Sequence, residues 1–402
     1  MTLSKKYRNI VLSVLIVLSL LFSGCTGNQK PTKEEDTSLP SLTRHDIEFL
    51  QQQSLNFFDQ YINTDTGYLT IPSTNISITD HILTGHVYAD LKEKNNTFPG
   101  LLQQNINSIV RRYNDNPNQF NLLQTSLLLD LLYKTPESTS NPSLEHDLAD
   151  RILNYSTNQH FNTTPILSNE AGQALTALSK YTYYRQNESS QTNLTQLINY
   201  YVTELQTTDL SVEKGYFKPW FTQSLYNLKK YNLSNNRLYP LIATINNQLI
   251  SQQELSEIPS LGKYSHPAPM LNNSLQFQFY CLQSMITSYN QSQTQNDTIN
   301  QSDFHQSIIL NLIYLKNTLV NMNNLTPQQH LIFLPIIHQT NTVLSSDSWT
   351  YLWDSSTQTL IEGKELETSN TLWTALTIGV MGSIGLLSLV FIIIRLYYKN
   401  QN

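Results

Sequence analysis

Apolar residues recur at spacings of three and four from about residue 42 to residue 340, and turns rich in Asn, Pro and Ser interrupt them. This spacing places apolar side chains on one face of an α-helix. The pattern predicts one all-α domain built from twelve helices. Their predicted ranges are Arg44 to Ile62, His81 to Lys92, Gly100 to Tyr113, Phe120 to Lys134, Glu145 to Tyr155, Asn169 to Arg185, Thr195 to Gln206, Trp220 to Tyr231, Leu238 to Gln252, Asn273 to Tyr289, Phe304 to Met322 and Thr326 to Gln339.

A motif similar to Gln-Ser/Ala-Leu-x-x-Leu-x-x-Tyr recurs among these helices, at Gln124 to Tyr133, Gln173 to Tyr181 and Gln223 to Tyr231. A looser copy runs from Ser274 to Ile286. The first three copies begin about 50 residues apart with one more helix between each pair, which is typical of stacked helical hairpins. Such hairpins form an open α-solenoid or a closed α/α toroid. We favour the toroid, with the repeated helices as its inner ring.

The N-terminus has the features of an export signal. Basic residues precede an apolar run, Ile10 to Phe22, that is shorter than the roughly 20 residues a membrane-spanning helix needs. The run ends in Leu-Phe-Ser-Gly-Cys, which resembles a prokaryotic lipobox, although Phe22 stands where Leu, Val or Ile is preferred. The resemblance implies that Cys25 carries a lipid. Cleavage without a lipid and a retained N-terminal anchor are the alternatives.

The C-terminus contains an apolar stretch, Leu372 to Ile394, that no charged residue interrupts and that is long enough to cross a bilayer. Arg395 follows it, and because positive charge marks the cytoplasmic side, we expect the tail inside the cell and the middle of the chain outside. Small residues recur at every fourth position of this stretch, a spacing that lets two membrane helices associate closely. They are Ala375, Gly379 and Ser383.

These features divide the chain into six parts. They are a signal with a lipobox-like end (1–25), a flexible tether (26–41), an extracytoplasmic all-α domain (42–345), a juxtamembrane segment (346–371), a transmembrane helix (372–394) and a cytoplasmic tail (395–402). Within the juxtamembrane segment, Ser348 to Glu367 alternates like a short β-hairpin. We therefore expect the protein at the cell membrane with its main domain facing outward.

The composition excludes several classes of function. Only 13% of the residues are charged, the net charge is −6, and no block of Lys or Arg occurs in the middle of the chain, so no surface is suited to nucleic acid. The chain has no glycine-rich phosphate-binding loop and no His or Cys spacing typical of a metal site, so we predict no cofactor and no metal. Cys281 lies in an apolar stretch and is expected to be a buried small hydrophobe.

We looked for catalytic and binding residues at the starts of the predicted inner helices. Closed α/α toroids generally place their active sites at one mouth of the ring, where loops lead into these helices. Glycan hydrolysis commonly uses two carboxylates, and Asp80 and Glu170 are nominated as that catalytic pair. The alternative for Glu170 is a favourable interaction with the helix dipole. Tyr216, Trp220 and His266 are nominated for substrate binding, and packing between helices is the alternative role for the aromatic residues.

The leading hypothesis is a membrane-anchored surface domain that binds or processes an extracellular polymer, with glycan as the favoured polymer. The alternative is a non-catalytic surface scaffold or an accessory subunit of a membrane complex. One concave pocket that holds Asp80, Glu170 and Trp220 together would favour the enzyme. Positions on separate faces would argue against it.

Overall fold

The computed structural model describes residues 39–72, 75–93, 97–135, 141–155, 168–185, 188–207, 218–233, 238–256, 259–265, 274–295, 298–319, 325–344 and 349–364. From Pro40 onward the chain forms one compact unit. Each of the twelve predicted helices is present in the described residues, with boundaries shifted by a few residues. They are α2 (Arg44–Tyr61), α3 (Ile78–Leu91), α4 (Phe98–Asp115), α5 (Leu122–Lys134), α6 (Pro142–Tyr155), α7 (Asn169–Arg185), α8 (Glu188–Thr207), α9 (Lys218–Lys230), α10 (Leu238–Ser251), α12 (Leu275–Gln295), α13 (Thr298–Thr318) and α14 (Pro327–Gln339).

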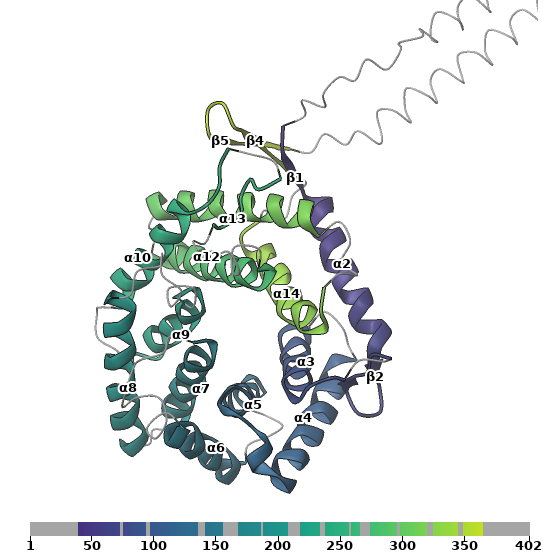
Figure 1. Cartoon of the computed structure of the whole chain (residues 1–402), viewed down its shortest axis with the longest axis vertical. Helices are drawn as coiled ribbons and strands as arrows, with labels where there is room; N and C mark the ends of the chain where they lie inside the picture. The colour runs from purple at the N-terminus through teal and green to yellow at the C-terminus, as the bar shows by residue number, and fades with distance from the viewer. Residues whose placement is uncertain are drawn as a thin grey trace, which may run out of the picture. The chain divides into compact units, whose positions relative to one another are not determined.

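The helices form two concentric rings (Figure 1). In the inner ring, α3, α5, α7, α9, α12 and α14 each pack on the next, and α14 packs back on α3. In the outer ring, α4, α6, α8, α10 and α13 pack on the inner helices that precede them, and α2 packs on α14. This closure confirms the predicted α/α toroid and excludes the open solenoid. The helices that carry the repeated motif lie in the inner ring, as predicted.

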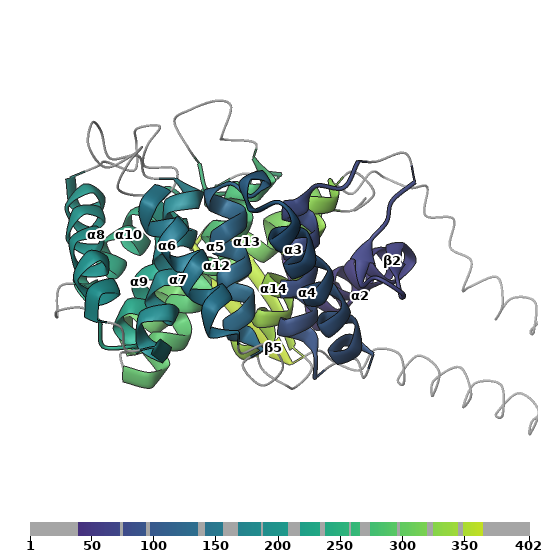
Figure 2. The ribbon, with the colours of Figure 1, turned by 90° about the horizontal axis from the view of Figure 1, so that it is seen from below.

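Inner and outer helices alternate along the chain, and each inner helix packs beside its outer neighbour. Successive helices therefore run in opposite directions, and all inner helices run in the same direction. Figure 2 shows the helices of both rings side by side along a common direction. The first residues of the inner helices consequently lie at one mouth of the ring, and their last residues lie at the other.

Reciprocal caps fix the starts of several helices. At α3, the Ser77 hydroxyl accepts a hydrogen bond from the Asp80 amide (3.1 Å), and the Asp80 carboxylate accepts one from the Ser77 amide (3.0 Å). Asn121 and Gln124 form the same arrangement at α5. Because each pair satisfies backbone N–H groups that have no partner inside the helix, it determines where the helix begins.

Apolar and small hydroxyl side chains hold neighbouring inner helices together. The hydroxyls of Thr176 on α7 and Ser224 on α9 lie 2.8 Å apart and are buried. Ser284 on α12 donates to the Thr222 hydroxyl on α9, also at 2.8 Å. Buried hydroxyls of this kind satisfy one another while the small side chains let the helices approach closely. Fully buried leucines and isoleucines surround them, among them Leu128, Leu175, Leu225, Leu282 and Ile309.

A three-stranded antiparallel sheet packs beside α13 and α2 in the order β1 (Ser41–Thr43), β4 (Trp349–Asp354) and β5 (Thr359–Lys364). The β4–β5 hairpin was expected from the alternating pattern and is confirmed. Trp349, Tyr351 and Trp353 alternate on its buried face. Strand β1 was not predicted, because three residues are too short to show a period. A second, smaller hairpin joins β2 (Ile62–Asn63) to β3 (Tyr68–Leu69).

The predicted signal segment, Cys25, the predicted span 372–394 with Ala375, Gly379 and Ser383, and the tail lie outside the described residues. Among the helices that the structure describes, none is both long and apolar enough to cross a bilayer.

The position of Gly262, in the connection between α10 and α12, requires a residue without a side chain. Its φ is +83°, and a Cβ atom there would lie 1.8 Å from the Leu310 carbonyl oxygen of α13. We predict that Gly262→Ala lowers the unfolding free energy by at least about 2 kcal/mol, because the backbone must move and the conformation is strained. Thermal unfolding of the purified chain measures the loss.

The matched control is Gly100→Ala, where a Cβ meets no atom within 4 Å. This change should leave the melting temperature unchanged or slightly raised, since Ala favours a helix over Gly. Equal melting temperatures for Gly262→Ala and the unchanged chain would contradict the described packing of this connection.

Candidate functional site

The inner ring encloses a cavity of about 360 Å³, which we call the lumen. All six inner helices contribute to its lining. Amide side chains are the most frequent lining group, and hydroxyl, charged, aromatic and aliphatic side chains complete it. The amides are Asn169, Gln173, Gln223, Asn227, Gln276, Gln283, Gln328 and Gln339.

Each inner helix turns one narrow face toward the lumen. On α7 this face is made of residues spaced by four, three and four positions, which a helix of 3.6 residues per turn brings onto one side. The same spacing occurs on α3 and α5. The three stripes are Thr79, Leu83, His86 and Asp90 on α3; Leu123, Leu127, Asp130 and Lys134 on α5; and Asn169, Gln173, Thr176 and Lys180 on α7.

The half of the lumen nearest the helix starts is uncharged among the described lining residues. Trp220 on α9 and Tyr280 on α12 are in contact there, with ring centroids 4.0 Å apart and planes tilted by 55°. Gln276 and Gln328 occupy the first turns of α12 and α14 beside them. This half therefore combines aromatic faces with amides that both donate and accept hydrogen bonds.

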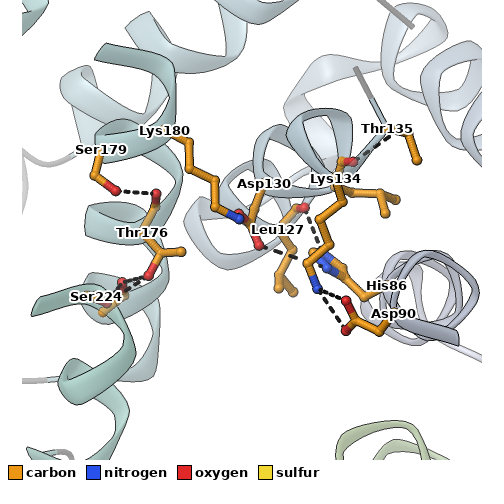
Figure 3. Close-up of polar contacts among 12 residues, drawn as sticks. His86, Asp90, Leu127, Asp130, Lys134, Thr135, Thr176, Ser179, Lys180 and Ser224 are labelled. Atoms are coloured by element: carbon orange, nitrogen blue, oxygen red, sulfur yellow. Dashed lines mark hydrogen bonds and ion pairs between the residues drawn. The ribbon is translucent and has the colours of Figure 1, made fainter. Parts of the chain in front are cut away.

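The half nearest the helix ends carries a paired set of charges (Figure 3). Lys134 Nζ donates to both carboxylate oxygens of Asp90, at 2.8 Å each. Lys180, from the neighbouring helix α7, forms an ion pair with Asp130. Two lysines and two aspartates thus neutralise one another, and their ion pairs join the neighbouring helices α3, α5 and α7.

Asp130 is buried, with 5% of its surface exposed. Burial alone would raise its pKa, but the charge of Lys180, with smaller effects of His86 and Lys134, lowers the pKa to about 2. Asp130 is therefore ionised at neutral pH. A general acid must hold a proton before it can donate one, so Asp130 is not suited to that role.

His86 lies beside this ion pair and is 7% exposed. Its Nε2 is 3.0 Å from the Leu127 carbonyl oxygen, and because a carbonyl can only accept, Nε2 carries the hydrogen. Its Nδ1 is 3.9 Å from the nearest Asp130 carboxylate oxygen. Burial, with a contribution from the charge of Lys134, lowers the pKa of His86 to about 4. The imidazole is therefore neutral at pH 7, and Nδ1 is a hydrogen-bond acceptor.

The nominated carboxylates lie elsewhere. Asp80 is engaged in the cap of α3 and is not part of the described lining. Glu170 lies in the first turn of α7, where its neighbour Asn169, and not Glu170 itself, lines the lumen. The lumen therefore does not bring the nominated pair together; the acids it does hold are Asp90 and Asp130.

Of the three residues nominated for substrate binding, the structure places one in the lumen and does not describe the other two. Trp220 lines the lumen, where it contacts Tyr280. Tyr216 and His266 lie outside the described residues. Within the described part of the chain, no group of three or more His, Cys, Asp or Glu side chains is placed to hold a metal ion.

The charged residues of the lumen were not predicted from the sequence. One signal was present, because Asp130 interrupts the apolar run from Leu127 to Leu132 and a charge in such a run requires a buried partner. The partner, Lys180, lies fifty positions further along the chain. Only the packing of α5 on α7 brings the two together.

Comparisons with known proteins give a match at the level of the fold alone. No protein family and no curated protein matches the chain. Among solved structures, the GH76A alpha-1,6-mannanase from Salegentibacter sp. HEL1_6 is similar, at 11% identity over 75% of this chain and 99% of the enzyme, with a TM-score of 0.49. An inactive variant of that enzyme, in complex with alpha-1,6-mannotetrose, has the same identity and coverage and a TM-score of 0.51.

The low pKa of His86 predicts acid sensitivity. The unfolded chain binds a proton on this residue below about pH 6.5, whereas the folded chain binds it only below about pH 4. Stability is therefore full above pH 6.5 and should fall by up to about 3 kcal/mol between pH 6.5 and pH 4. Denaturant unfolding at several pH values in this window measures the slope.

The variant His86→Gln should flatten this slope. His81, whose pKa burial also lowers to about 4, should retain part of it. The matched control is His45→Gln on the exposed face of α2, which should keep the slope of the unchanged chain. An identical slope in His86→Gln and the unchanged chain would show that His86 is not held neutral in the lumen.

Proposed function

We propose that the lumen of this toroid binds a neutral oligosaccharide. The observation that carries the proposal is the described lining itself: amides or hydroxyls from five of the six inner helices, one pair of aromatic rings, and charges that are already neutralised within the lumen. A volume of about 360 Å³ falls within the roughly 300–1,000 Å³ of small-molecule sites.

The chemistry of the lining suits a sugar. Each sugar hydroxyl both donates and accepts a hydrogen bond, and Gln and Asn side chains offer both functions in one group. Trp220 and Tyr280 present apolar ring faces that can cover the C–H face of a pyranose. Because Lys134 and Lys180 are each ion-paired, neither is free to neutralise an acidic substituent without breaking a pair, so a neutral sugar is favoured over an acidic one.

Two further observations favour binding over hydrolysis by two carboxylates. Asp90 and Asp130 are both paired with lysine, and the pKa of Asp130 is about 2. The inactive form of the similar mannanase has two consecutive aspartates replaced, whereas no two consecutive aspartates occur in this sequence. A glycosidase needs one carboxyl group protonated, and the lowered pKa of Asp130 does not suit that role.

We also propose a location at the cell membrane with the toroid outside. The support is the apolar segment 372–394, the positive charge that follows it, and the lipobox-like sequence before Cys25. Strands β1 and β5 belong to one sheet, so Ser41 and Lys364, near the two ends of the described residues, lie in the same sheet. This arrangement is compatible with two anchors in one bilayer.

Titration calorimetry with a panel of neutral tetrasaccharides, alpha-1,6-mannotetrose among them, tests the binding proposal. We expect one or more to bind, and Trp220→Ala and Gln173→Leu each to weaken that binding at least about tenfold, or ~1.4 kcal/mol. The matched control is Phe49→Ala on α2, an outer helix, where 46% of the ring is exposed. No binding across the panel, or equal weakening by the control, would refute the proposal.

Cell fractionation tests the location. The full chain should sediment with membranes, and Cys25→Ala should still sediment because the span 372–394 remains. Cys25→Ala combined with removal of residues 365–402 leaves neither proposed anchor. Once its signal is cleaved, this variant should be found in the soluble fraction. A full chain found in the soluble fraction would contradict both anchors.

A further inference from the structure

Four tyrosines gather at the mouth where the inner helices end. Tyr184 stacks on Tyr133, with ring centroids 5.2 Å apart and planes within 9°, and Tyr183 stacks on Tyr231 at 4.5 Å and 29°. Tyr183 and Tyr184 contact each other at 5.2 Å with nearly perpendicular rings. We call this group the tyrosine platform. It joins the last turns of α5 and α7 to the residue that follows α9.

The platform is exposed to an unusual degree for large rings. Tyr183 is 47% and Tyr184 is 51% exposed, although most large apolar and aromatic side chains described in this chain are buried. Stacking between helices explains why the rings touch one another. Stacking does not explain why the two most exposed rings lie at a mouth of the lumen, and exposed aromatic surface of this kind often marks a binding site.

The platform continues the lumen stripes of α7 and α9. On α7, the stripe Asn169, Gln173, Thr176 and Lys180 reaches Tyr183 and Tyr184 after three and four further residues. On α9, the stripe of Trp220, Gln223 and Asn227 reaches Tyr231 after four. On α5, Tyr133 lies about 100° around the helix from Lys134, the last lumen residue, and its hydroxyl donates to Glu145 of the outer helix α6, so Tyr133 borders the lumen stripe and does not continue it. The exposed rings therefore lie where the lumen opens.

One ion pair and one further lysine border the platform. Arg185, which directly follows Tyr184, donates to both carboxylate oxygens of Glu145, at 2.7 and 2.8 Å. The Tyr133 hydroxyl donates to the same carboxylate at 2.5 Å. Lys230 lies 5.7 Å from the centre of the Tyr231 ring. A surface of half-exposed aromatic rings with hydroxyl edges matches a polyhydroxylated ligand.

From this continuity we infer that the tyrosine platform is a second contact for a glycan chain whose other part occupies the lumen. The inference rests on the proposed function and adds the substrate class, a polysaccharide longer than the lumen can hold. A second contact on one chain acts at high effective concentration, so affinity should rise with glycan length without any change in the lumen.

The test compares a short with a long glycan of the same linkage, beginning with alpha-1,6-mannotetrose and linear alpha-1,6-mannan and extending to other neutral pairs. For the unchanged chain we expect the polysaccharide to bind at least about tenfold more tightly than the tetrasaccharide. Tyr183→Ser combined with Tyr184→Ser should remove this gain while the tetrasaccharide affinity changes less than twofold. Tyr183→Phe combined with Tyr184→Phe keeps the rings and should keep most of the gain.

The outcomes separate the two claims. A length-dependent gain that survives in the double serine variant overturns the platform and leaves the lumen proposal intact. Loss of tetrasaccharide binding in a folded double serine variant also overturns it, because the tyrosines then act through the structure of the lumen. If no glycan of either length binds the unchanged chain, the proposed function and the platform fall together.

Discussion

The closure of α14 onto α3 leaves each inner helix only one narrow face that contacts no other helix. Two inner neighbours and one outer helix cover the rest, which is why α5 is buried almost continuously from Thr125 to Leu132. Polar groups in such a helix must either pair with a neighbouring helix, as Thr176 does with Ser224, or face the lumen. The ring thus sorts the polar residues of six helices onto one internal surface, and the candidate site is a consequence of that sorting.

A charge on that surface carries a large desolvation cost unless an opposite charge accompanies it. The structure meets this constraint with two aspartates and two lysines, and the charge of Lys180 lowers the pKa of Asp130, which makes that carboxylate a poor proton donor. The inactive alpha-1,6-mannanase variant that binds alpha-1,6-mannotetrose has a similar fold. Fold and chemistry are separable, because the fold supplies the internal surface and individual side chains decide what happens there.

Much of the architecture was predictable from the sequence, because helices and their stacking leave periodic signals. The three-and-four spacing located all twelve helices, the repeated Gln-to-Tyr motif identified inner helices, and alternation located the β4–β5 hairpin. The site was less predictable. Asp80 and Glu170 were nominated from their position at helix starts, yet Asp80 serves as a cap. Asp130 interrupts an apolar run and so signals a buried partner, but only the packing of α5 on α7 shows that the partner is Lys180. The sequence of either helix alone does not determine their relative register.

The most direct test of the central claim is a crystal structure of the protein with a bound neutral tetrasaccharide. The account predicts sugar density inside the ring, with one pyranose against Trp220 and Tyr280, hydrogen bonds to lumen amides, and the Lys180–Asp130 ion pair intact. A sugar bound only on the outer helices, or an empty lumen at saturating tetrasaccharide, would contradict it.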